Sequence, residues 1–86
     1  MPSYVVEAYV SSLEQGKLDD AAERAREAAV AISAEGRHIR FVRSTFLPLD
    51  EVGFLVFEAD SADVVRELAA RAEITHERIV EVVEVV

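Results

Sequence analysis

Apolar side chains occupy both alternating sets of positions in residues 39–58, which we interpret as two β-strands and the turn between them. In the first strand, Ile39 and Phe41 lie on one side and Val42 and Phe46 on the other. In the second strand, Phe54 and Val56 lie on one side and Leu55 and Phe57 on the other. A strand with one face in water alternates between apolar and polar residues. Both faces of this predicted strand pair therefore require cover.

Strands are also predicted near both ends of the chain. Residues 3–10 are rich in Tyr and Val, which favour a half-buried pleated surface. Residues 78–86 alternate irregularly between Val or Ile and Glu. The central pair is predicted at residues 37–46 and 52–58, joined by a loop in which Pro48 favours a turn.

Two amphipathic helices are predicted between these strands. Residues 17–33 place Leu, Ala and Ile at helical spacing with charged residues on the opposite side, and Gly36 is placed to end this helix. Asp60 or Ser61 can cap a second helix, which ends near Glu73. Each helix therefore has one apolar side with which to cover a sheet.

The order strand, helix, strand, strand, helix, strand is that of the ferredoxin-like α+β fold, βαββαβ. We expect residues 1–86 to form one domain with a four-stranded antiparallel sheet. Right-handed crossovers place both helices on one face of it, so the other face is bare in a monomer. Two such sheets stacked face to face, as in dimeric α+β barrels, remove this surface from water. The sequence therefore predicts a homodimer formed through the sheet face.

Composition and charge narrow the classes of partner. Hydrophobic residues make up 51% of the chain, a high share for one small domain, and this excess favours an interface. The net charge of -8 argues against nucleic acid and anionic membrane surfaces as partners, because both bind basic surfaces. The chain has no cysteine, which excludes disulfides and thiolate metal ligands.

The location of the protein is predicted from what the sequence lacks. The first residues show no basic leader followed by an apolar core, so we expect no signal peptide. No apolar run approaches the roughly 20 residues that a membrane span requires. We therefore expect a cytoplasmic protein without a membrane partner.

Four segments resemble a family of small proteins of mostly unknown function. They are residues 41–45 (FVRST), 58–60 (EAD), 64–69 (VVRELA) and 77–82 (ERIVEV). The family includes a nickel-binding protein with a ferredoxin-like fold that dimerises, and its usual strand pattern resembles Trp-Val-x-Ser-Tyr. The resemblance runs from Tyr4 to the C-terminus and implies the ferredoxin-like fold, a dimer and a divalent metal such as nickel.

The sequence departs from this family at positions that matter for a metal. Family members often carry Cys in the third strand and His in the second helix, where this chain has Leu55 and Leu68. Phe41 replaces the family's Trp, and Thr45 replaces its Tyr. The resemblance therefore implies the fold and the dimer more strongly than it implies nickel binding.

His38 is the candidate metal ligand. It opens the second predicted strand, and the other histidine, His76, precedes the last one. With a carboxylate such as Glu7, Glu58 or Glu81, His38 could form a transition-metal site if the fold brought their strand ends together. The alternative interpretation is an exposed histidine at a strand end, because neither histidine has a partner at the spacing of a preformed metal-binding pair.

Glu7, Tyr9, Arg43 and Glu81 are the candidates for lining a ligand cavity. Arg43 lies among apolar residues, so its side chain must reach water at a sheet edge or enter a cavity and meet a carboxylate. Glu7 or Glu81 on a neighbouring strand would supply that carboxylate, and the pair would orient an anionic or polar small molecule. Tyr9 would donate a phenol hydrogen bond. For Arg43, a cross-strand ion pair on a solvated rim is the alternative interpretation.

Two classes of function agree with these features. The first is a small dimeric binding or accessory protein without catalysis, which binds a small ligand or a divalent metal. The second is a small enzyme of the dimeric α+β barrel type, such as an isomerase, cyclase or cofactor-free monooxygenase, acting on a small organic molecule between sheet and helices. That enzyme needs a His, an Asp or paired Tyr residues in its cavity, and the spacing nominates no catalytic pair. The fold alone does not choose between the classes.

Overall fold

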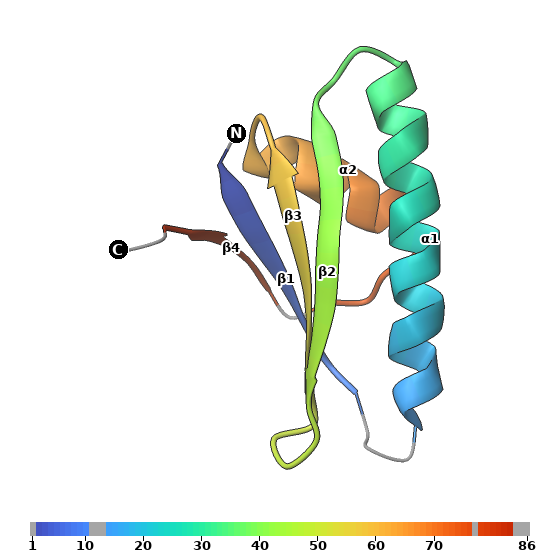
Figure 1. Ribbon diagram of the computed structural model, residues 1–86, viewed down its shortest axis with the longest axis vertical. Helices are drawn as coiled ribbons and strands as arrows, with labels where there is room; N and C mark the ends of the chain where they lie inside the picture. Colours follow the sequence, from blue (N-terminus) through green and yellow to red (C-terminus); the bar gives the residue numbers. More distant parts are fainter. Residues whose placement is uncertain (1, 11–13, 77, 84–86) are drawn as a thin grey trace.

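The computed structural model describes residues 2–10, 14–76 and 78–83 and confirms the predicted order of elements (Figure 1). The strands are β1 (Ser3–Tyr9), β2 (Ile39–Leu47), β3 (Val52–Ala59) and β4 (Arg78–Val82), and the helices are α1 (Gln15–Ala34) and α2 (Ala62–Arg71). This βαββαβ order, with its four-stranded antiparallel sheet, is the ferredoxin-like α+β fold. Neither of the two described helices combines the length and the apolarity needed to cross a membrane.

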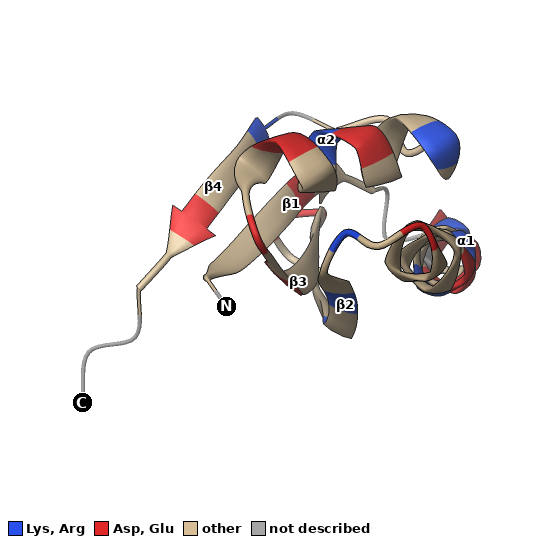
Figure 2. Ribbon diagram, turned by 90° about the horizontal axis from the view of Figure 1, so that it is seen from above, with Lys and Arg blue, Asp and Glu red and all other residues tan. Residues whose placement is uncertain are grey.

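The strands form one sheet in the order β2-β3-β1-β4, and each neighbouring pair is antiparallel. α1 packs along β2, whereas α2 packs against β3 and β4. Figure 2 shows both helices on the same side of the sheet. We name this side the covered face. On the opposite side, the open face, no described helix lies against the strands.

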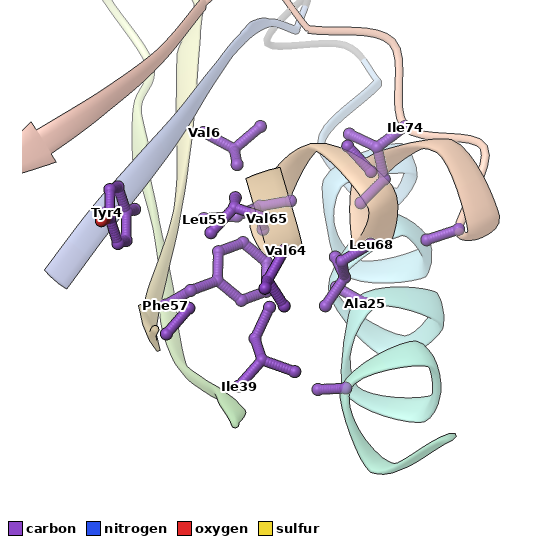
Figure 3. Packing of buried hydrophobic residues seen from close by; sticks show 14 of the residues in the cluster. Tyr4, Val6, Ala25, Ile39, Leu55, Phe57, Val64, Val65, Leu68 and Ile74 are labelled. Atoms are coloured by element: carbon purple, nitrogen blue, oxygen red, sulfur yellow. The ribbon is translucent and has the colours of Figure 1, made fainter. Parts of the chain in front are cut away.

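The covered face forms one side of the hydrophobic core (Figure 3). Val6, Leu55 and Phe57 from the strands are each at most 1% exposed. Ile32 from α1 and Leu68 from α2 close over them and are fully enclosed. Alternate residues of β1 and β3 therefore build the core, and the residues between them point to the open face.

A β-bulge between Phe41 and Arg43 changes the face on which the second half of β2 presents its side chains. Val42 is the extra residue, because the pairing of β2 with β3 passes from Phe41 directly to Arg43. An extra residue reverses the alternation beyond it. The prediction that Phe46 lies on the side opposite Phe41 is therefore wrong, since both pack against the core. The same reversal places Arg43 on the open face.

The ends of the elements follow from local geometry and from pairing. Gly36 follows α1 with a φ of 98°, a left-handed conformation that glycine adopts without steric penalty. β4 ends at Val82 because its partner strand begins at Ser3, which pairs with Val82. The predicted last strand is thus too long at Val83, and its residues 84–86 lie outside the described ranges.

Four charged residues join α2 to the turn that leads from α1 into β2. Arg37 contacts Glu67, and nitrogen atoms of Arg71 lie 2.6 Å from carboxylate oxygens of both Glu67 and Glu35. Hydrogen bonding from Arg37 lowers the pKa of Glu67 to about 2. Hydrogen bonding from Arg71 likewise lowers the pKa of Glu35. The cluster therefore helps to hold the helices in place over the sheet.

Candidate functional site

Three transverse rows of side chains on the open face span all four strands. Directly paired residues of antiparallel strands point to the same side of a sheet. From β2 through β3 and β1 to β4, the rows are Arg40-Glu58-Ser3-Val82, Arg43-Val56-Val5-Val80 and Thr45-Phe54-Glu7-Arg78. The middle row therefore consists of valines with one arginine at its β2 end.

A hollow of about 360 Å³ lies on this face, and all four strands contribute to it. Its lining is mainly apolar, with two arginines, a glutamate and a threonine; the residues are Val5, Glu7, Arg43, Thr45, Phe54, Val56, Arg78, Val80 and Val82. Pockets that hold small molecules have volumes of roughly 300 to 1,000 Å³. This site, which we name the sheet hollow, therefore has the size and the lining of a small-molecule site once its open side is covered.

Two ion pairs lie at diagonally opposite corners of the open face. Glu7 Oε2 lies 3.0 Å from Nε of Arg78, and Glu58 Oε1 lies 3.0 Å from Nε of Arg40. Hydrogen bonding from Arg40 lowers the pKa of Glu58. The Glu7 side chain is only 15% exposed, so its charge lies close to the sheet. Each described glutamate of this face is thus paired with an arginine on a neighbouring strand.

Arg43 differs from the other two arginines of the open face. It is exposed and lines the sheet hollow. Within the described ranges, no hydrogen bond or ion pair involves its side chain, and the two glutamates of the face are paired with Arg40 and Arg78. Arg43 is therefore a cation beside a row of valines without a counter-charge from the described part of the sheet.

The predicted cavity residues do not share one site. Glu7 and Arg43 both line the sheet hollow, but Glu7 pairs with Arg78 rather than with Arg43. Tyr9, at the end of β1, is 64% exposed and lines a separate hollow beside α1. Glu81 pairs with a core residue of β1 and so lies on the covered side of the sheet. The structure thus brings two of the four residues together.

His38 lies just before β2 and is exposed. Its backbone N–H donates to Asp60 Oδ2 over 3.4 Å, and its carbonyl accepts a hydrogen bond from the Asp60 N–H over 3.1 Å. The other histidine, His76, has Nδ1 3.2 Å from the carbonyl oxygen of Ile74. Across the described residues, no three His, Asp or Glu side chains gather closely enough to hold a metal ion. These residues therefore do not fit the nickel site that the family resemblance implies.

The space between the sheet and the helices holds the apolar core. Tyr4 is buried there among apolar side chains, as Figure 3 shows. In the part of the chain that the structure describes, no charged residue is buried in this space. The enzyme hypothesis requires a His, an Asp or paired Tyr residues at this place, and the described core offers no such group.

The sequence pattern does not single out Arg78, Phe54 or Val80 as site residues. The spacing of Arg78 and Val80 does indicate that they lie on the same face of the sheet, because residues two apart on a strand share a face. Which face that is depends on the pairing of β4 with β1. The sequence alone does not specify this register, so the full set of residues around the hollow emerges only from the fold.

Comparisons with known proteins support the fold and add nothing about the site. No family model matches the chain, and no curated protein matches it. Among solved structures, the chain is similar to the crystal structure of SCO4226 from Streptomyces coelicolor A3(2), with a TM-score of 0.62 and 17% sequence identity. The similarity covers 98% of this chain and 99% of that chain. At this identity it shows a shared fold alone.

Proposed function

We propose that this protein is a homodimeric small-molecule-binding module in which the open sheet faces of two copies pack against each other. The observation that carries this proposal is the middle row of the open face, where Val56, Val5 and Val80 lie side by side on three strands. No described helix covers them. A second copy supplies the missing cover.

Hydrophobic burial favours a second copy as the cover, and the two ion pairs at the corners of the face do not oppose it. Val80 and Val82 are 38% and 39% exposed, and removing apolar surface from water contributes roughly 25 cal/mol per Å². A two-fold axis of the dimer can lie between the open faces of the two subunits and cross the middle row. It then places the middle row of one subunit against the same row of the other. The corner glutamates already have arginine partners, so closing the interface leaves neither of them as an unpaired buried charge.

Binding rather than catalysis is the role that this arrangement supports. Stacking two open faces encloses the sheet hollow of each copy between the subunits, with a mainly apolar lining and few polar groups. Such a lining is typical of small-molecule sites. The proposal does not include a metal, because the described residues do not gather a ligand set. Nickel binding through His38 stays a prediction of the family resemblance.

Light scattering after size-exclusion chromatography tests the dimer with two matched variants. Val80→Glu places a charge in the middle row, whereas Val30→Glu places the same charge on α1, where Val30 is 68% exposed. We expect masses of two chains for the wild type and Val30→Glu, and one 9.5 kDa chain for Val80→Glu. Circular dichroism checks that both variants remain folded. A monomeric wild type, or a folded Val80→Glu dimer, would contradict the proposal.

A further inference from the structure

We infer that Arg43 binds the carboxylate of a small organic acid whose apolar body lies in the sheet hollow, between the two subunits. This inference rests on the proposed dimer and names the class of ligand that the dimer takes. Three features support it: the charges of the open face, the lining of the hollow and the chemistry of the guanidinium group.

The charges of the open face leave Arg43 unbalanced. Arg40 and Arg78 have glutamate partners at about hydrogen-bonding distance, whereas the side chain of Arg43 has none among the described residues. A second copy brings the same set of charges, with its two glutamates paired in the same way. Covering Arg43 without a counter-charge is unfavourable, since a buried charge requires a partner. An anion in the hollow supplies that partner.

The rest of the lining selects an acid with an apolar body. Val56 lies beside Arg43 in the middle row, and Val5 and Val80 continue this row across the sheet. Phe54 borders the row on the side of Arg78. A ligand anchored at the β2 end of the row therefore extends its remaining atoms over valine and phenylalanine side chains. A highly charged or sugar-like molecule would leave its polar groups unpaired there.

A carboxylate matches the polar groups at the β2 end. The guanidinium presents parallel N–H donors that fit the two oxygens of a carboxylate. Thr45 lies two residues further along β2 and lines the same hollow, so its hydroxyl adds a donor on the same side. The glutamate of the hollow, Glu7, already accepts from Arg78 and lies towards the opposite edge of the sheet. Arg43 and Thr45 thus define the anion-binding end.

Isothermal titration calorimetry with octanoate and octanamide tests the inference, because these probes share an apolar tail and differ in charge. The variants are Arg43→Gln and Arg43→Lys, with Arg66→Gln on the exposed side of α2 as a control for lost charge. We expect wild type and Arg66→Gln to bind octanoate at least about tenfold more tightly than octanamide, the size of one charge-assisted hydrogen bond. Arg43→Gln should lose this preference, and Arg43→Lys should keep part of it.

The mass of each sample, measured by light scattering, separates the two proposals. A dimeric wild type that does not prefer octanoate, or an Arg43→Gln dimer that keeps the full preference, overturns the carboxylate site and leaves the dimer intact. A monomeric wild type overturns the dimer, and the carboxylate site between subunits with it.

Discussion

The two faces of one sheet differ in what covers them, although the same strands supply both. On the covered face, Leu55 and Phe57 are at most 1% exposed because the helices close over them. On the open face, Val56 lies between these two residues along β3 but on the opposite side of the strand. Its row continues to Val80, which stays 38% exposed. Neighbouring residues of one strand thus belong either to the buried core or to the exposed open face.

Apolar content alone does not identify a core. Both faces carry Val and Phe. In the described strands β1 and β2, however, the charged residues Glu7, Arg40 and Arg43 all lie on the open face, and none lies on the covered face. Helices cannot cover such residues without leaving charges buried. A surface that combines valines with paired corner charges suits an interface that forms after folding.

The largest expected effect comes from truncating the core side of β3. Phe57→Ala should lower the free energy of unfolding by about 3 to 5 kcal/mol, because it leaves a cavity at a residue with 0% exposure. Phe54→Ala, on the open face of the same strand, should cost about 1 kcal/mol or less. Urea unfolding in the Val80→Glu background measures both without a contribution from dimerisation. Equal losses would mean that the two faces do not differ in this respect.

A smaller effect is expected at Gly53 of β3, where the side chain of Leu18 from α1 lies close to the sheet. A Cβ atom at Gly53 would lie 2.8 Å from Cδ1 of Leu18, a buried residue of α1. Gly53→Ala should therefore destabilise the protein by about 1 kcal/mol, because the end of the Leu18 side chain must shift. Gly16→Ala is the control, because no described atom outside its own helix turn lies within 4 Å of its added Cβ, and alanine should stabilise this helix position. If both variants unfold at the same urea concentration, the Leu18 side chain of α1 does not pack closely against Gly53.

Lowering the pH should destabilise the folded state through protonation of Glu67. Its pKa is lowered from 4.5 to about 2 by Arg37, so the folded state binds its proton less readily than the unfolded chain. This stabilisation is present above pH 4.5 and is lost as the pH falls towards 2. Thermal unfolding followed by circular dichroism should show a weaker acid dependence in Glu67→Gln. Glu27→Gln, on the exposed side of α1, should follow the wild type; identical curves for all three would refute the prediction.

The smallest effect is expected at His38. Because the described residues gather no metal-ligand group around it, nickel titrated into the wild type and into His38→Ala should give indistinguishable heats. The calorimeter would also reveal the opposite result. Nickel binding that disappears in His38→Ala would support the site that the family resemblance implies.

The order of elements was predictable because strands and helices leave different periods in the sequence. The two-residue alternation of the strands and the three-to-four-residue spacing of the helices led to the ferredoxin-like fold, which the structure confirms. The side of Phe46 was not predictable. The bulge at Val42 reverses the alternation of β2, and the residues around it carry no glycine or proline that would indicate a bulge.

The candidate site was predictable only in part, because it depends on pairing between strands distant in sequence. Arg43 was identified as a charge among apolar residues and Glu7 as a candidate carboxylate partner for it, and both line the sheet hollow. The assignment of Glu81 to the same cavity required a register that the fold does not have, since Glu81 pairs opposite Tyr4. A shift of one residue in this pairing exchanges the two faces of β4, and it also decides the position of Arg78.

Nuclear magnetic resonance on dimers of one labelled and one unlabelled chain tests whether two open faces meet. An isotope-filtered experiment detects only contacts between the chains. We predict contacts between subunits from the methyl groups of Val5, Val56 and Val80, and none from the core residue Val6. A spectrum in which the three open-face valines show no contact with the partner chain would contradict the account.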